Sequence, residues 1–260
     1  MVRVSRNAMG TLFVGGALSM TLAALVYPSL LGVDTVSNAA SRVIADTQWG
    51  PLTEGDRDFV VQVRAAGLWA YPVAQMGLTK GTDKGVVAAS KHLVDGHAAL
   101  DLTCRKIAPL LNITLPNQAS PQQTRFVSQL TADTKGEQFD RDFSTILRQT
   151  DGSFFGTAAA IRTTTKNALV RALADQADHV LLDHIVTLEQ TGLVDIEQAL
   201  SRQAASPDLP ASDLTPPPGI PGQQTAVLTP PPNPTSTPVD IDRIAGTEDG
   251  VTASPNTGKK

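Results

Sequence analysis

The helical periodicity of residues 51–200 is the feature that most constrains the fold of this 260-residue chain. Apolar side chains recur there at steps of three and four residues in four long segments, which is the period of an amphipathic α-helix. No stretch of any length alternates in the manner of a β-strand. Four such helices joined by short connections predict an all-α, antiparallel four-helix bundle, and about 150 residues are enough for one hydrophobic core.

Capping residues indicate where the helices begin. Thr53, with Asp56 three residues later, predicts the start of the first helix, and Pro72 is expected to kink this helix or break its hydrogen-bond ladder. The second helix is expected after Thr82-Asp83. Ser120-Pro121-Gln122-Gln123 is a capping box with proline at the first helical position, and it predicts a short extra helix. The third and fourth long helices are expected from about Glu137 and about Lys166.

Two histidines fall on apolar helix faces. At about 100° per residue, His97 lies near the middle of the second stripe and His184 is central to the fourth. His92 and His179 point away from these stripes and are expected at the surface. Asp151 lies at the rim of the third stripe.

The N-terminal segment is predicted to be a membrane anchor. Arg3 and Arg6 precede an uncharged run over residues 7–33, whose apolar centre is residues 10–31. About 20 apolar residues span a bilayer, and the two arginines favour a cytoplasmic N-terminus. We therefore expect a single-pass protein of the cell membrane with an extracytoplasmic domain. The alternative is a secreted protein, released by signal cleavage near Ala39, although a signal peptide has a shorter apolar core of ~7–15 residues.

The C-terminal part is rich in proline. Twelve of the 18 prolines lie between Pro207 and Pro255, among Thr, Ser, Gly and Gln. Such a composition is typical of a segment that buries too little apolar surface to offset its ordering entropy, so we expect a disordered tail. The predicted organisation is an anchor or signal segment, a linker, a bundle and a tail, over residues 1–35, 36–50, 51–200 and 201–260.

Composition excludes several classes of function. The formal net charge is −4, which argues against nucleic-acid binding because such proteins usually carry a basic face. The single cysteine, Cys104, excludes a disulfide framework and a Cys-rich zinc module. No nucleophile motif, Gly-rich phosphate loop or zinc-protease motif is present, so the sequence offers no catalytic residues.

Several short motifs, in order, resemble a known family over roughly residues 50–200. They include Gly50-Pro51-Leu52-Thr53, Ala66-Gly67-Leu68-Trp69, Leu115-Pro116-Asn117-Gln118 and the run from Leu188 to Val194. The chain resembles the ferritin-like "domain of unknown function four-one-four-two" family of exported bacterial proteins. The resemblance implies a ferritin-like four-helix bundle and implies no known reaction.

The resemblance also implies one polar, potential ligand residue on each long helix. By this resemblance, the potential ligand on the second long helix is His97, two residues after Asp95. On the fourth long helix it is His184, directly after Asp183. The third helix has Asp151 where the family usually has histidine. The first helix has Ala70 where the family usually has glutamate.

The carboxylate set argues against a di-iron oxidase. Such a site takes a Glu from two helices and Glu-x-x-His from two others, and this chain has no Glu-x-x-His. We therefore expect no cofactor, with His97 and His184 as buried, hydrogen-bonded core residues. The alternative is one mononuclear zinc or iron site made by His97, His184 and Asp151, with Asp101, one turn after His97, as a further ligand.

The expected function is a non-enzymatic binding or structural module of the cell envelope. Residues 10–31 would hold it in the membrane, and its partner would be an envelope protein or the wall polymer. The alternative is a metal-binding or metal-dependent redox protein. The sequence leaves the oligomeric state open.

Overall fold

A computed structural model describes residues 40–204 and 209–245 of the chain. The chain divides into two units, Met1–Arg42 and Val43–Lys260, and every element named below belongs to the second. The apolar run expected to anchor the protein lies outside the described residues. Among the helices that are described, none has the length and apolar character needed to cross a membrane.

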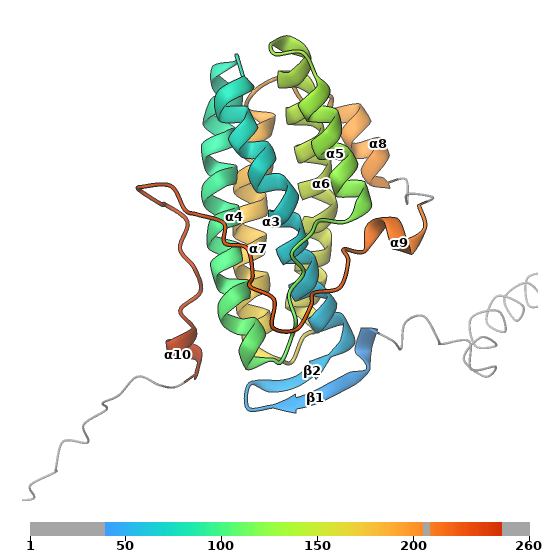
Figure 1. Ribbon diagram of the computed structural model, residues 1–260, viewed down its shortest axis with the longest axis vertical. Coiled ribbons are helices and arrows are strands. Elements are labelled where there is room, and N and C mark those ends of the chain that lie inside the picture. The colour runs from blue at the N-terminus through green and yellow to red at the C-terminus, as the bar shows by residue number, and fades with distance from the viewer. Residues whose placement is uncertain (1–39, 205–208, 246–260) are drawn as a thin grey trace, which may run out of the picture. The chain divides into compact units, whose positions relative to one another are not determined.

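Four long helices form the core of the structure, as the periodicity predicts (Figure 1). They are α3 (Glu54–Lys80), α4 (Lys84–Leu110), α6 (Glu137–Thr164) and α7 (Ala168–Glu189). The other elements are β1 (Val43–Thr47), β2 (Gly50–Thr53), α5 (Pro121–Ala132), α8 (Ile196–Ala204), α9 (Ala211–Leu214) and α10 (Ile241–Ala245).

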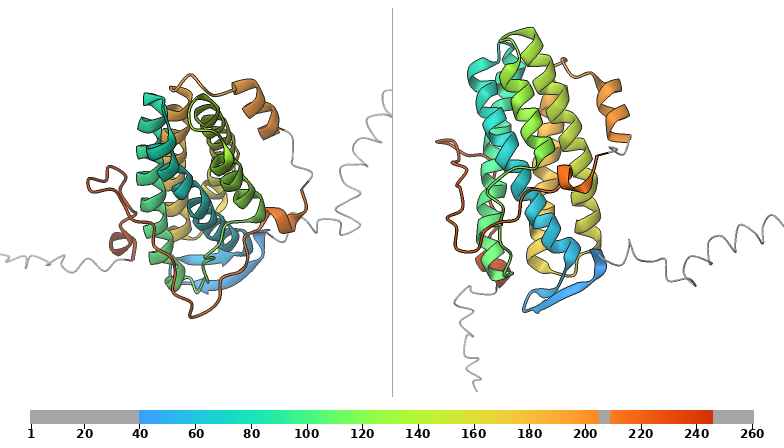
Figure 2. Two further views of the ribbon diagram at one scale, coloured as in Figure 1. Left: turned by 45° about the horizontal axis from the view of Figure 1, so that its top comes forward. Right: turned by 45° about the vertical axis from the view of Figure 1, so that its right-hand side comes forward.

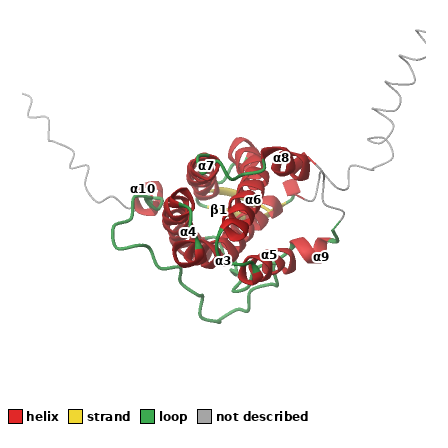
Figure 3. Cartoon of the chain, turned by 90° about the horizontal axis from the view of Figure 1, so that it is seen from above, coloured by secondary structure: helices red, strands yellow, loops and turns green. Residues whose placement is uncertain are grey.

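The long helices pack in the cyclic order α3, α4, α7, α6, as the view along the bundle shows (Figure 3). The connection through α5 carries the chain back along the bundle, so that α6 begins at the end where α4 begins. Asp140 marks this end, because its carboxylate accepts hydrogen bonds from the backbone amides of Thr82 and Asp83 at 3.1 and 2.9 Å. Each long helix is therefore antiparallel to both of its neighbours.

The predicted caps are confirmed. Thr53 and Asp56 form a capping box at the start of α3, and Ser120 and Gln123 form another at the start of α5. The α3 helix runs through Pro72 to Lys80 as one element, because the buried side chains around the proline hold it against the core. Asn167 caps α7 through two backbone amides, so this helix begins at Ala168.

The sequence did not predict the β-hairpin. β1 and β2 pair antiparallel, and the hairpin lies at the end of the bundle where α6 connects to α7. Asn167 Nδ2 donates to Thr47 Oγ1 and to the Gly50 carbonyl, both at 3.1 Å. Gly50 has a φ of 105°, and a Cβ atom there would collide with the Lys166 carbonyl. The hairpin is held by contacts with residues distant in the sequence, and its strands show no alternation of apolar and polar residues that could have predicted it.

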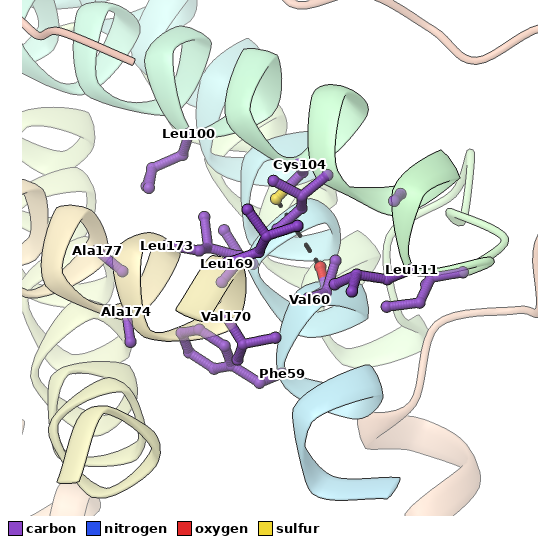
Figure 4. Close-up of a cluster of buried hydrophobic side chains, with 14 of the residues drawn as sticks. Phe59, Val60, Leu100, Cys104, Leu111, Leu169, Val170, Leu173, Ala174 and Ala177 are labelled. Atoms are coloured by element: carbon purple, nitrogen blue, oxygen red, sulfur yellow. Dashed lines mark hydrogen bonds between the residues drawn. The ribbon is translucent and has the colours of Figure 1, made fainter. Parts of the chain in front are cut away.

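Two clusters of buried apolar side chains fill the bundle. One lies towards the hairpin and includes Phe59, Cys104 and Leu169, as Figure 4 shows. The other includes Leu93 and Phe143. Cys104 is fully buried, and its Sγ atom lies 3.9 Å from the Val60 carbonyl oxygen. Burial, followed by the nearby Asp101 carboxylate, raises the pKa of this thiol, so Cys104 is a packing group.

The expectation of a disordered tail is wrong for residues 209–245. Residues 223–241, which we call the strap, cross α3 and α4 without strand structure, bend at residues 232–233 and 236, and lead into α10 (Figures 1 and 2). Leu228 and Ile241 are buried against the bundle. Burial of these two side chains, with hydrogen bonds to buried charged side chains, offsets the conformational entropy lost when the segment is ordered. The average composition alone suggests that this loss is too large to be offset.

Candidate metal centre

Three helices bring three of the predicted ligands together in the middle of the bundle. His97 comes from α4, Asp151 from α6 and His184 from α7, and only 2%, 4% and 1% of each residue is exposed. One ligand atom from each lies within 4.8 Å of the other two. The imidazole rings of His97 and His184 are 5.0 Å apart between centroids. The structure therefore brings together the His-Asp-His set named from the sequence.

A close approach of α4 and α7 positions His184. A Cβ atom on Gly96 would lie only 2.5 Å from His184 Nε2 and 2.6 Å from Val180 Cγ1. The missing side chain lets the His184 ring lie directly on the α4 backbone, where Nε2 is 3.3 Å from the His92 carbonyl oxygen. Sequence analysis did not single out Gly96, and its only signal is a helical glycine next to a histidine on an apolar face.

The bond to His92 fixes the chemistry of the other His184 nitrogen. A carbonyl only accepts hydrogen bonds, so Nε2 carries the proton and, in the neutral ring, Nδ1 presents a lone pair. This Nδ1 faces the Asp151 carboxylate, with Oδ2 at 3.3 Å. Neither atom makes a hydrogen bond to any described residue. The two atoms face each other without a hydrogen bond, an arrangement that a positive charge between them would stabilise, either a proton on Nδ1 or a bound cation.

His97 adds two further donor atoms without partners. Neither of its ring nitrogens is hydrogen-bonded within the described part of the chain. Burial, and secondarily the proximity of His184, lowers the pKa of His97 well below its ordinary value. The ring is therefore neutral at pH 7 and has a lone pair free for a metal. The expectation that both histidines are ordinary hydrogen-bonded core residues does not fit His97.

A cleft connects this group to the surface. It has a volume of about 760 Å³ and runs between α3, α5 and α6, with Ala70, Phe126 and Asp151 among its lining residues. The two histidines do not line it. A molecule in the cleft would therefore reach the centre from the side of Asp151.

Asp101 does not join the centre. Its carboxylate is paired with the buried guanidinium of Arg64, accepts from Arg105 Nε at 2.9 Å and accepts from the backbone amide of Leu228 at 3.1 Å. The sequence places Asp101 one turn after His97, but the distant partners Arg64 and Leu228 direct its side chain to the strap. Arg64 carried no signal in the sequence analysis.

The other two histidines lie at the surface, as expected. His92 Nδ1 is 2.8 Å from Asp183 Oδ2, and both side chains are about half exposed. His179 Nδ1 bonds to the Asp175 carbonyl within its own helix. Neither residue contributes to the buried group.

A family model described as a domain of unknown function, DUF4142, matches residues 42–191. The chain belongs to the DUF4142 family. The resemblance seen in the short motifs is thereby confirmed. No curated protein and no solved structure matches the chain. All three members of the His-Asp-His group lie inside the DUF4142 match, whereas the strap lies beyond its end.

The lowered pKa of His97 leads to a pH prediction for the metal-free protein. Below about pH 6.5 the unfolded chain binds a proton at His97 that the folded protein excludes. The stability due to the neutral ring is therefore complete above this pH and is lost as the pH falls. We expect the free energy of unfolding to fall by up to about 1.4 kcal/mol per pH unit from this group. Urea denaturation with a chelator present measures it, and an unchanged slope in His97→Leu would contradict the assignment.

Proposed function

We propose that this DUF4142 protein binds one divalent transition metal, zinc or iron(II), through His97, Asp151 and His184. The observation that carries the proposal is the buried His-Asp-His group, in which His184 Nδ1 and Asp151 Oδ2 lie 3.3 Å apart without a hydrogen bond and both ring nitrogens of His97 lack a hydrogen-bond partner among the described residues. Buried polar groups are normally hydrogen-bonded, and a cluster of exceptions calls for a ligand.

The donor set suits these metals. Two neutral imidazoles and one carboxylate are typical of zinc sites with three protein ligands, and of iron(II) sites with open positions. Zinc–ligand distances of about 2.0–2.2 Å would require the three donor atoms to draw closer than their present spacing. The open position would lie towards the cleft beside Asp151.

We also propose the setting of this centre. The charge and length of the N-terminal apolar run support a bundle held outside the cytoplasm by residues 10–31. In that setting the domain would act as a metal-binding module of the cell envelope, with an envelope protein or the wall polymer as its partner.

Metal analysis of the full chain, purified without an affinity His-tag, tests the proposal. We expect about one zinc or iron per chain, removable by a chelator, and its loss in both His97→Ala and His184→Ala. His179→Ala is the matched control, because His179 is exposed on the same helix as His184. Metal at 100 times its Kd should stabilise the metal-free protein by about 2.7 kcal/mol. Absence of metal, with no thermal shift on adding zinc or iron(II), would refute the proposal.

A further inference from the structure

The face of α3 and α4 beneath the strap carries buried charged groups that bind the backbone of a peptide segment. Arg64 is only 1% exposed, and its Nη2 donates to the Ala226 carbonyl at 2.8 Å. Its partner Asp101 accepts from the Leu228 amide at 3.1 Å. One buried ion pair therefore recognises both a carbonyl and an amide of the strap backbone, which any extended segment offers.

Asp95 forms a second recognition point further along α4. Its Oδ2 accepts from the Thr235 amide, the Thr235 hydroxyl and the Ser236 amide, each at 2.7 Å. Asp95 is 4% exposed, and its Oδ1 has no hydrogen-bond partner in the described ranges. Without the strap, the carboxylate would lose all three of these bonds, so the bundle surface is complete only with an occupant.

An apolar notch lies near these recognition points. Gly67 on α3 has no side chain, and Leu228 Cδ1 lies 3.0 Å from the point where its Cβ would be. The His97 carbonyl oxygen lies 3.9 Å from the same point. The Leu228 side chain therefore fills the space beside Gly67, close to the backbone of His97, which is a proposed metal ligand.

The residues that form the groove lie inside the DUF4142 match, and the strap that occupies it lies outside. The groove residues are Arg64, Gly67, Asp95 and Asp101. The receptor surface thus belongs to the domain, and the peptide is an appended segment rich in threonine and proline.

We propose that this groove is a binding site for a Thr/Pro-rich peptide segment without regular secondary structure, filled here by the chain's own strap, and that its occupancy tightens metal binding at His97. The second part rests on the proposed function. Asp95 lies two residues before His97 and Asp101 lies four after it, so the strap contacts α4 on both sides of His97, and it contacts α3 through Arg64. Coupling between the two sites is reciprocal, so a bound metal also holds the strap.

Two aspartate substitutions in the full chain test the coupling. Leu228 is 8% exposed and Val227 is 60% exposed, so Leu228→Asp should release the strap while Val227→Asp adds the same charge without releasing it. We expect Leu228→Asp to weaken zinc affinity by about tenfold, measured by competition with a fluorescent chelator, and Val227→Asp to leave it unchanged. Zinc should also slow hydrogen exchange at the amides of Thr235 and Ser236. Equal zinc affinity in Leu228→Asp and the wild type would overturn the coupling.

A synthetic peptide of residues 223–241 tests the groove itself. Added to the Leu228→Asp protein, the labelled peptide should bind saturably and restore zinc affinity, whereas a peptide carrying the same Leu228→Asp change should do neither. Lack of saturable binding would overturn the groove. If the wild type binds no metal at all, the proposed function fails, and peptide binding still decides the groove separately.

Discussion

Replacing Arg64 by methionine is expected to lower the free energy of unfolding by about 3–5 kcal/mol. The guanidinium is buried, and burial lowers its pKa against the opposing effect of Asp101. Its loss leaves the Asp101 carboxylate with Arg105 as its remaining cationic partner, and leaves the carbonyls of Pro116 and Ala226 without a donor. Urea denaturation of the full chain measures the change.

Arg57→Met is the matched control for this substitution. Arg57 pairs with Glu54 and Asp58 on the surface of the same helix, and 40% of its side chain is exposed. Exposed ion pairs contribute ~0–1 kcal/mol, so this variant should remain close to the wild type. Similar losses in the two variants would mean that the buried network has no special role in stability.

Gly96→Ala is expected to cost about 1–3 kcal/mol and to weaken metal binding. The added methyl group would overlap His184 Nε2 and Val180 Cγ1, both on α7. The ring must then move away from α4, which breaks its bond to the His92 carbonyl and misaligns Nδ1. Thermal denaturation and metal stoichiometry measure the two effects.

Gly156→Ala provides the opposite control within α6. Beyond the adjoining backbone of its own helix, no atom lies within 4 Å of the Cβ that this change would add, and the residue is exposed. Alanine in an open helical position should stabilise the protein by about 0.5–1 kcal/mol. If Gly96→Ala kept full stability and bound metal normally, the close approach of α4 and α7 would not be what positions His184.

Local patterns predicted the bundle and named the three members of the buried His-Asp-His group. The stripes located the four long helices, and the capping residues Thr53 and Ser120 located two of the starts. The same helical geometry placed His97 and His184 inward, because a residue's face depends only on its place along its own helix. Asp101 was wrongly grouped with His97, because its direction depends on Arg64, which lies 37 residues away in the sequence.

The strap and the hairpin could not be predicted in this way. The composition of the tail is that of a disordered segment, yet two apolar residues and a few buried charges are enough to dock it. The bond between Arg64 and Ala226 joins residues 162 positions apart. Neither periodicity nor average hydropathy contains information on such pairs.

The burial of Cys104 gives this protein a built-in reporter of core opening. A thiol that is fully enclosed and has a raised pKa stays unreactive towards alkylating reagents while the helices remain packed. Because the chain has no other cysteine, every labelled molecule is one in which this part of the core has opened. The rate of labelling would therefore measure the opening equilibrium around Phe59 and Leu169 without any added probe.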